Sequence, residues 1–297
     1  MAKFPSEEQE KVILHSGRPL IVIAAPGTGK TSTIVARMIR LLKEDLNREV
    51  SFITFTRTSR RDTDKKVTNE FDKKALEKAG TSFPRISTLH TYAKSIVHKH
   101  ASQVGRQPSF SVLIDDRGER NLLLSELIDD LKIKIDPLRL QKELVCYRCT
   151  GSFRSDCDLP PNTRKKLLKH LEILLRFYNT FDMEGLVLSA CDIISSNDVV
   201  LPAIFLQVDE YQDLNPADQK LISLISSIKG SQVVVVGDDA QSIYPFRHAN
   251  PDGIRELWNS SDWEKVKFTN CHRLPPHILR AAQSLISKEN YLGGKVK

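Results

Sequence analysis

Short runs of apolar, mostly β-branched residues recur along the chain, and each run ends beside a turn or a polar cluster. Continuous apolar runs of this length are typical of strands that are buried on both faces of a sheet. The runs are Leu20–Ala24, Val50–Phe55, Pro84–Thr88, Ile204–Val208, Val233–Val236 and, more weakly, Val266–Phe268. Helical patterns separate them, and this alternation predicts an α/β fold with a parallel sheet flanked by helices.

The pattern changes between residues 100 and 194, where apolar positions recur at helical spacing and β-branched runs are scarce. The helical stripes are Leu124, Leu127, Ile128 and Leu131, and then Leu167, Leu168, Leu171, Leu174, Leu175 and Tyr178. Apolar positions at this spacing form one face of a helix. We therefore predict a helical insertion subdomain of residues 100–194 within a discontinuous α/β domain of residues 1–99 and 195–297.

Charge adds a second constraint to this picture. The 297 residues include 44 Lys and Arg against 37 Asp and Glu, which gives a formal net charge of +7 at pH 7. A basic surplus favours polyanionic partners, nucleic acid first, although ordinary solvated surface explains it as well. Arg164-Lys165-Lys166 and Lys169 adjoin an apolar stripe, and a solvated helix face is favoured there over a phosphate contact.

Cysteine usage and hydropathy indicate the compartment. The five cysteines are Cys146, Cys149, Cys157, Cys191 and Cys271. An odd, sparse count argues against a disulfide framework, and reduced thiols are favoured over a zinc site built on the first three. No apolar run approaches the roughly 18 residues that span a bilayer, and the N-terminal residues lack a signal-peptide core. We expect a cytoplasmic protein, nuclear in a eukaryote, with no membrane partner.

The segment Ala24-Ala25-Pro26-Gly27-Thr28-Gly29-Lys30-Thr31 carries the first candidate chemistry. It lies between the first predicted strand and a helical pattern, which is the context of a phosphate-binding loop. Glycine lets backbone N–H groups approach phosphate oxygens, and the following helix N-terminus favours an anion. In such a loop Lys30 reaches the β- and γ-phosphates and Thr31 holds Mg²⁺. A plain small-residue turn is the alternative interpretation.

Acidic residues follow a later predicted strand. Asp209 and Glu210 come directly after Ile204–Val208. In a nucleotide hydrolase, an aspartate in this position holds Mg²⁺ and a glutamate activates the attacking water. A strand that ends in a polar turn is the alternative. Because the carboxyl ends of parallel strands meet at one edge of a sheet, we expect these acids to lie near Lys30.

Two further loops follow predicted strands. After Val233–Val236, Gln241 is placed to contact a γ-phosphate or the attacking water, and Tyr244, Phe246 and Arg247 follow closely. Aromatic rings interleaved with arginine suit single-stranded nucleic acid, since bases stack on rings and arginine meets phosphate. Periodicity alone favours core packing for the two rings. After Val266–Phe268, Arg273 is placed to stabilise charge on a transferring phosphoryl group.

Taken together, these segments resemble the superfamily 1 DNA helicases of the UvrD/PcrA/Rep type. The resemblance rests on ordered motifs at Phe4–Gln9, Ala24–Thr31, Ile53–Arg57, Thr88–Ala93, Val208–Asn215, Gly237–Arg247 and Asn270–Arg273. In that family Ala24 is the ordinary start of the phosphate loop. Two positions depart from it: His272 stands where the family often has tyrosine, and His248 stands where it often has glycine.

The resemblance implies a RecA-like P-loop NTPase domain that uses ATP and Mg²⁺ and contacts single-stranded DNA. Gln9 would hydrogen-bond adenine and His272 would stack on it, while Gln241 and Arg273 would sense the γ-phosphate. The implied nucleotide contacts are Gln9, Ala24, Ala25, Pro26, Gly27, Thr28, Gly29, Lys30, Thr31, Ser32 and His272. The implied DNA contacts are Phe55, Thr56, Arg57, His90, Tyr244, Phe246 and Arg247.

The family has a second RecA-like domain with further motifs, and few residues follow Arg273. We therefore expect the ATP-binding N-terminal portion of a helicase or translocase with 3′ to 5′ polarity. Alone it is expected to be weak or inactive and to act with a second helicase domain or chain. The alternative is a non-catalytic module that binds ATP or single-stranded DNA and regulates a partner chain.

Overall fold

The computed structural model describes residues 5–45, 48–54, 57–70, 85–113, 118–196, 204–286 and 291–292. The chain divides into two compact units. The first contains residues 1–89, 201–215 and 222–297, and the second contains residues 90–200 and 216–221. The finer domain boundaries expected at residues 99/100 and 194/195 stay a prediction.

The first unit is built on a parallel sheet. Among the described residues, six strands pair in the order β3-β2-β6-β7-β1-β8, and every neighbouring pair is parallel. The strands are β1 (Leu20–Ala24), β2 (Val50–Ile53), β3 (Arg85–Ser87), β6 (Phe205–Val208), β7 (Gln232–Gly237) and β8 (Glu264–Phe268). The parallel α/β sheet predicted from the apolar runs is therefore confirmed.

The strand ends differ slightly from the prediction. Strand β2 ends at Ile53, and Phe55 at the end of the predicted run lies outside the described residues. Strand β6 begins at Phe205 rather than Ile204. Strand β8 begins at Glu264, two residues before the predicted run, because pairing with β1 continues through its polar residues. Apolar runs thus locate these strands but not their last paired residue.

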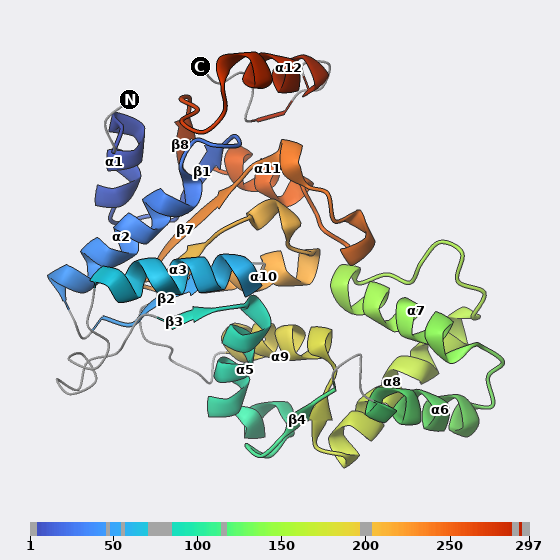
Figure 1. Ribbon diagram of the computed structural model, residues 1–297. Helices are drawn as coiled ribbons and strands as arrows, with labels where there is room; N and C mark the ends of the chain where they lie inside the picture. Colours follow the sequence, from blue (N-terminus) through green and yellow to red (C-terminus); the bar gives the residue numbers. More distant parts are fainter. Residues whose placement is uncertain are drawn as a thin grey trace. The chain divides into compact units, whose positions relative to one another are not determined.

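Helices pack on the sheet of the first unit (Figure 1). They are α1 (Glu7–Leu14), α2 (Lys30–Glu44), α3 (Arg57–Glu70), α11 (Asp252–Asn259) and the second half of α10 (Pro216–Ser226). Helix α12 (Pro276–Ile286) belongs to the same unit but is exposed along most of its described length. Alternate residues of a strand share a face. Leu20 and Val22 of β1 accordingly pack in one buried cluster with Val12 of α1, Met38 of α2 and Val67 of α3.

Sheet order explains why distant motifs meet. Strands β6, β7, β1 and β8 are consecutive neighbours in the sheet, although β1 and β6 are far apart in the sequence. All four are parallel, so their carboxyl ends open on the same edge. Ligands of open α/β sheets bind at that edge. The segments that follow these four strands contain Lys30, Asp209 and Glu210, Gln241, and Arg273.

The second unit is mainly helical. Its helices are α5 (Leu89–Lys99), α6 (Gly118–Leu131), α7 (Pro137–Thr150), α8 (Pro161–Phe177), α9 (Met183–Ser195) and the short 3₁₀ turn at Ala101–Val104. Leu124, Leu127, Leu167 and Leu171 are buried in one cluster, as the helical spacing predicted. The pattern did not predict the short parallel pair β4 (Ser111–Val112) and β5 (Thr180–Phe181). Two-residue strands contain no apolar run that periodicity can detect.

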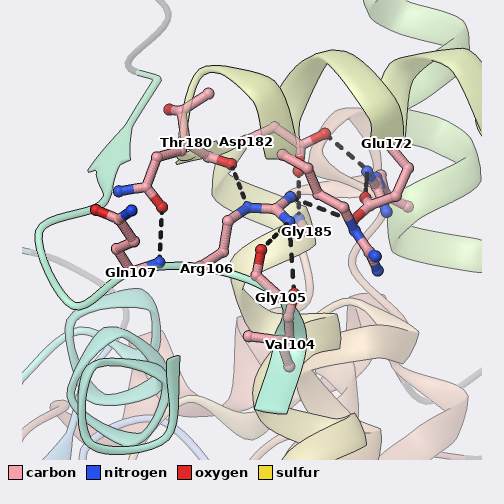
Figure 2. Close-up of polar contacts among 11 residues, drawn as sticks. Val104, Gly105, Arg106, Gln107, Glu172, Thr180, Asp182 and Gly185 are labelled. Carbon is pink, nitrogen blue, oxygen red and sulfur yellow. Dashed lines mark hydrogen bonds and ion pairs between the residues drawn. The ribbon is translucent and has the colours of Figure 1, made fainter. Parts of the chain in front are cut away.

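The buried side chain of Arg106 links strand β5 of this pair to helix α8 (Figure 2). The side chain of Arg106 is 1% exposed and donates from Nε to the carbonyl oxygen of Thr180 at 3.1 Å. Its two terminal nitrogens reach the carbonyl oxygens of Val104 and Gly105 and the carboxylate of Glu172. Burial lowers the pKa of Arg106, and the neighbouring Glu172 carboxylate opposes that shift. One guanidinium thus satisfies backbone groups that would otherwise be buried without partners.

Replacing Arg106 with alanine is expected to lower the free energy of unfolding of the second unit by about 3 kcal/mol, because several partners lose a charge-assisted donor. Chemical denaturation measures the change. Arg176→Ala is the matched control, since Arg176 bonds the same Glu172 but is 58% exposed. The control is expected to cost less than about 1 kcal/mol. Equal losses in the two variants would contradict this role for Arg106.

All five cysteines are free thiols, and burial raises the pKa of Cys191 to about 11. Within the described ranges, no group of three or more His, Cys, Asp or Glu side chains is arranged to hold a metal ion. In the same part of the chain, no helix combines the length and apolar character needed to cross a membrane.

Candidate functional site

The loop between β1 and α2 depends on two glycines. Gly27 and Gly29 adopt left-handed backbone conformations, with φ of +74° and +85°. A Cβ on Gly29 would lie 2.6 Å from Nε2 of Gln9, and one on Gly27 would lie 2.8 Å from Cβ of Arg273. Larger residues are therefore excluded by both conformation and space. The loop is a packed turn that leaves the first backbone N–H groups of α2 without helical partners.

The remaining loop residues differ in what they can offer a ligand. Ala24 and Ala25 are buried and have no polar side-chain atom, so they can offer a ligand only backbone groups. The hydroxyl of Thr28 is buried and donates to the carbonyl oxygen of Ala25 at 2.7 Å, which stabilises the turn. Pro26 and Ser32 are exposed. The loop therefore presents mainly backbone N–H groups, which is the chemistry that an anion such as phosphate requires.

Lys30 and Thr31, at the start of α2, meet the two acids at the end of β6. Nζ of Lys30 lies 3.9 Å from Oε2 of Glu210. Oγ1 of Thr31 donates to Oδ2 of Asp209 at 2.8 Å. Lys30 and Asp209 are buried, whereas the side chain of Glu210 is 35% exposed. The structure thus brings together the four residues that the sequence assigned to a triphosphate and its metal.

The electrostatics of this cluster favour an additional cation. Burial and the adjacent Glu210 raise the pKa of Asp209 to about 6. Burial and Glu210 also raise the pKa of Asp213 to about 7. Lys30 lowers both pKa values and Arg247 lowers that of Asp213, but these cations do not offset burial and the charge of Glu210. A carboxylate beside a hydroxyl, both oxygen donors, fits Mg²⁺, which takes one or two protein carboxylates and keeps several waters.

Glu210 has a strained backbone. Its φ is +54° and ψ is +47°, in the left-handed region that residues with a Cβ rarely adopt. Such a conformation costs of order 1–3 kcal/mol and persists where surrounding contacts fix it. Strained residues of this kind gather at functional sites. The 3₁₀ turn Tyr211–Asp213 begins directly after Glu210 and turns the chain away from the strand end.

Gln212 is a site residue that the sequence did not assign. Its Nε2 donates to Oε2 of Glu210 at 3.0 Å, and its Oε1 accepts the backbone N–H of Asp238 at 3.0 Å. Gln212 is only 1% exposed. One buried amide thus joins the acid at the end of β6 to the end of β7. The family motif at Val208–Asn215 includes the residue, but its burial and its partners were not visible in sequence.

The loop after β7 contains Gln241 and the aromatic residues. Nε2 of Gln241 donates to Oδ2 of Asp238 at 2.6 Å, so its side chain is held beside the strand end. The rings of Tyr244 and Phe246 meet edge to face with centroids 5.8 Å apart. Phe246 is 75% exposed, so the core packing favoured by periodicity is wrong for this ring. The segment is a 3₁₀ turn, Pro245–Arg247, in which helical or strand periodicity has no meaning.

The segment after β8 lies against the glycine loop. The backbone N–H of His272 donates to the carbonyl oxygen of Gly27 at 2.8 Å. The side chains of His272 and Arg273 are exposed. On the other side of the loop, Nε2 of Gln9 donates to the carbonyl oxygen of Thr28 at 3.0 Å. The sequence-predicted residues Gln9 and His272 are therefore both bonded to the same short loop.

Four predicted DNA contacts, Phe55, Thr56, Arg57 and His90, do not belong to the loops that follow β1, β6, β7 and β8. Phe55 and Thr56 lie outside the described residues. Arg57 is the first residue of α3. His90 lies on α5 in the second unit and is half-buried. His248, where the resemblance suggested glycine, has φ of +60°, which is a conformation that glycine adopts without strain.

A parallel sheet that gathers a glycine loop, a lysine and strand-end acids defines an α/β domain of the P-loop NTPase class. Comparison of the sequence with known protein families identifies the family within this class. The chain belongs to the UvrD/REP helicase N-terminal domain family, whose model matches residues 5–262. The resemblance read from the motifs is therefore confirmed, together with its RecA-like fold class.

Three curated relatives illustrate the similarity. The chain is 28% identical to the ATP-dependent DNA helicase Rep of Escherichia coli (strain K12), over 96% of this chain and 43% of the relative. It is 23% identical to the ATP-dependent DNA helicase PcrA of Leuconostoc citreum, over 96% and 39%. It is 26% identical to DNA helicase II of Rickettsia typhi, over 95% and 44%. The chain spans less than half the length of these relatives.

Proposed function

We propose that this chain is the ATP-binding part of a DNA helicase, and that the edge of the sheet where β1 and β6 end holds ATP and Mg²⁺. One observation carries the proposal: Lys30 and Thr31 meet Glu210 and Asp209, which are distant in sequence. A lysine, a hydroxyl and two carboxylates are the groups that phosphoryl transfer to water requires around a triphosphate. The names of the relatives, which are ATP-dependent DNA helicases, support it.

Each residue has a separate role in this proposal. The glycine loop and Lys30 bind the phosphate oxygens, and Thr31 and Asp209 hold the metal. Mg²⁺, when bound, neutralises charge on the β- and γ-phosphate oxygens. Glu210 takes the proton from the attacking water as the water oxygen bonds to the γ-phosphorus. The bond to the β–γ bridging oxygen then breaks, and ADP and phosphate are released.

The surrounding loops would supply recognition. Gln9 would hydrogen-bond the adenine and His272 would stack on it, since both border the glycine loop. Arg273 and Gln241 would contact the γ-phosphate, and Gln241 must first leave Asp238 to do so. The hydrogen bond of Gln212 to Glu210 would hold that carboxylate towards the attacking water.

Single-stranded DNA is the proposed second ligand, with 3′ to 5′ polarity. The exposed Phe246, the neighbouring Tyr244 and Arg247 support it, since stacking and phosphate contacts need exposed rings and cations. Phe55, Thr56, Arg57 and His90 are proposed contacts on the family resemblance alone. Helix α12 is exposed along most of its described length, which suits a further helicase domain or chain as partner.

Replacing Phe246 with alanine is expected to weaken binding of single-stranded DNA about tenfold, because one base loses its stacking partner. Fluorescence anisotropy of a labelled oligothymidine measures the change. Ile243→Ala is the matched control, because Ile243 is 69% exposed on the same loop but has no ring. The control is expected to bind normally. If the two variants bind equally well, the ring has no stacking role.

Nucleotide binding and turnover by the chain test the proposed function. Calorimetric titration is expected to show ATP binding that requires Mg²⁺, and single-stranded DNA is expected to stimulate a slow hydrolysis. Binding without any turnover would favour a non-catalytic module instead. Absence of ATP binding under these conditions would contradict the proposed function and leave only a module that binds single-stranded DNA.

A further inference from the structure

Glu8 connects helix α1 to the segment that follows β8. Its Oε2 accepts the backbone N–H of Thr269 at 2.9 Å, and its Oε1 accepts the hydroxyl of the same residue at 2.6 Å. Both bonds are partly buried. Because both oxygens of one carboxylate hold one residue, the contact fixes the direction of the chain as well as its position. No pattern in the sequence predicts this contact, because the two residues are 261 positions apart.

Hydrogen bonds stabilise both ends of helix α1, so the backbone of Glu8 has a fixed position. Ser6 caps the helix, and the Gln9 side chain bonds back to the backbone N–H of Ser6. At the other end, Arg40 donates to the carbonyl oxygen of Ile13 at 2.7 Å, and Arg37 donates to that of His15 at 3.0 Å. These bonds satisfy carbonyl groups at the helix end and tie α1 to α2.

Hydrogen bonds therefore connect three segments to one another: Glu8–Gln9, Gly27–Thr28 and Thr269–His272. Glu8 holds Thr269, the backbone of His272 donates to Gly27, and Gln9 donates to Thr28. Figure 1 shows α1, β1 and β8, which carry these segments, next to one another. Gln9 is one residue from Glu8, and His272 is three residues from Thr269. The Glu8 contact thus sets the separation between the two side chains proposed to border the nucleotide base.

We propose that Glu8 is a positioning residue that makes the site selective for an adenine base. The inference rests on the proposed ATP site. An adenine offers a hydrogen-bonding edge to the amide of Gln9 and a flat face to the imidazole of His272, so both contacts require a fixed separation. Without Glu8 the segment around Thr269 loses two charge-assisted hydrogen bonds, and the base contacts weaken while the phosphate contacts remain.

The test compares three ligands with the 297-residue chain: ATP, GTP and inorganic tripolyphosphate, each with Mg²⁺. Glu8→Ala is expected to weaken ATP binding about tenfold, which corresponds to the loss of one hydrogen bond to a charged group. Binding of tripolyphosphate, which has no base, is expected to stay unchanged. The preference for ATP over GTP is expected to fall, because the weakened contacts are those to the adenine base. Isothermal titration calorimetry measures all three dissociation constants.

Two variants control for effects of Glu8→Ala other than loss of the contact with Thr269. Glu7→Ala removes another acid from the first turn of α1 and therefore costs the same favourable interaction with the helix dipole, but Glu7 is exposed. It is expected to bind all three ligands normally. Glu8→Gln keeps an acceptor for the N–H of Thr269 and places its amide beside the hydroxyl, so near-normal ATP binding is expected. If Glu8→Ala fails to fold, Thr269→Val carries the test, because it removes the hydroxyl that Glu8 accepts and is expected to weaken ATP binding but not tripolyphosphate binding.

The outcomes separate this inference from the proposed function. If Glu8→Ala keeps the ATP preference of Glu7→Ala, or weakens all three ligands equally, the positioning role is overturned and the ATP site stands. If the unmodified chain binds none of the ligands, both are overturned. As a further check, Thr269→Val is expected to weaken ATP binding, and the loss should not add to that of Glu8→Ala. Full additivity would count against the contact.

Discussion

Replacing Lys30 with alanine is expected to weaken ATP binding at least about 100-fold and to reduce hydrolysis to background. The ammonium group is buried at the start of α2, beside the glycine loop, and is one of two side-chain cations, with Arg273, proposed to meet the phosphates. Hydrogen bonds to charged groups contribute about 1.5–3 kcal/mol each, and two phosphate contacts would be lost. Alanine is a better helix former than lysine, so α2 is expected to remain folded.

Calorimetric titration with Mg²⁺ and ATP measures the Lys30 effect. Lys43→Ala is the matched control, because Lys43 lies in the last turn of the same helix and is exposed. The control is expected to bind and hydrolyse ATP normally. Unchanged turnover in the Lys30 variant would refute the site.

Replacing Glu210 with glutamine is expected to separate binding from chemistry. Glutamine keeps the size of the side chain and an acceptor for Gln212, but it cannot take a proton from water. Hydrolysis is expected to fall by about 10²–10⁴, the range for loss of a general base. ATP is expected to bind at least as tightly, since one negative charge near the phosphates is gone. The variant would then hold ATP without turning it over.

Single-turnover hydrolysis in the presence of single-stranded DNA measures the Glu210 effect. Glu256→Gln is the matched control, since Glu256 is an exposed acid on α11. Normal hydrolysis is expected for the control. A Glu210 variant that hydrolyses ATP as fast as the unmodified chain would show that another group activates the water.

Much of the fold and the central part of the site could be predicted from the sequence. Buried strands are visible as apolar runs, because their two faces are both covered. Once a parallel sheet was predicted, the meeting of Lys30 with Asp209 and Glu210 followed from the rule that strands open on one edge. In the structure, Nζ of Lys30 lies 3.9 Å from Oε2 of Glu210, and Oγ1 of the neighbouring Thr31 lies 2.8 Å from Oδ2 of Asp209.

Other features were beyond sequence reasoning because they depend on tertiary contacts. The roles of Gln212 and Glu8 depend on hydrogen bonds to residues that are distant in the sequence, Asp238 and Thr269. Hydrophobic periodicity does not single out either residue. Arg106 is a charged residue whose burial depends on backbone carbonyl groups that fold around it. The exposure of Phe246 was predicted wrongly from periodicity, because a 3₁₀ turn has neither strand nor α-helical spacing.

The most direct measurement of the central claim is a crystal structure of the chain with Mg²⁺ and a non-hydrolysable ATP analogue. The account predicts that Nζ of Lys30 lies about 3 Å from phosphate oxygens. It also predicts that the metal lies between Oγ1 of Thr31 and the carboxylate of Asp209. A nucleotide bound elsewhere, with Lys30 still paired only to Glu210, would contradict it.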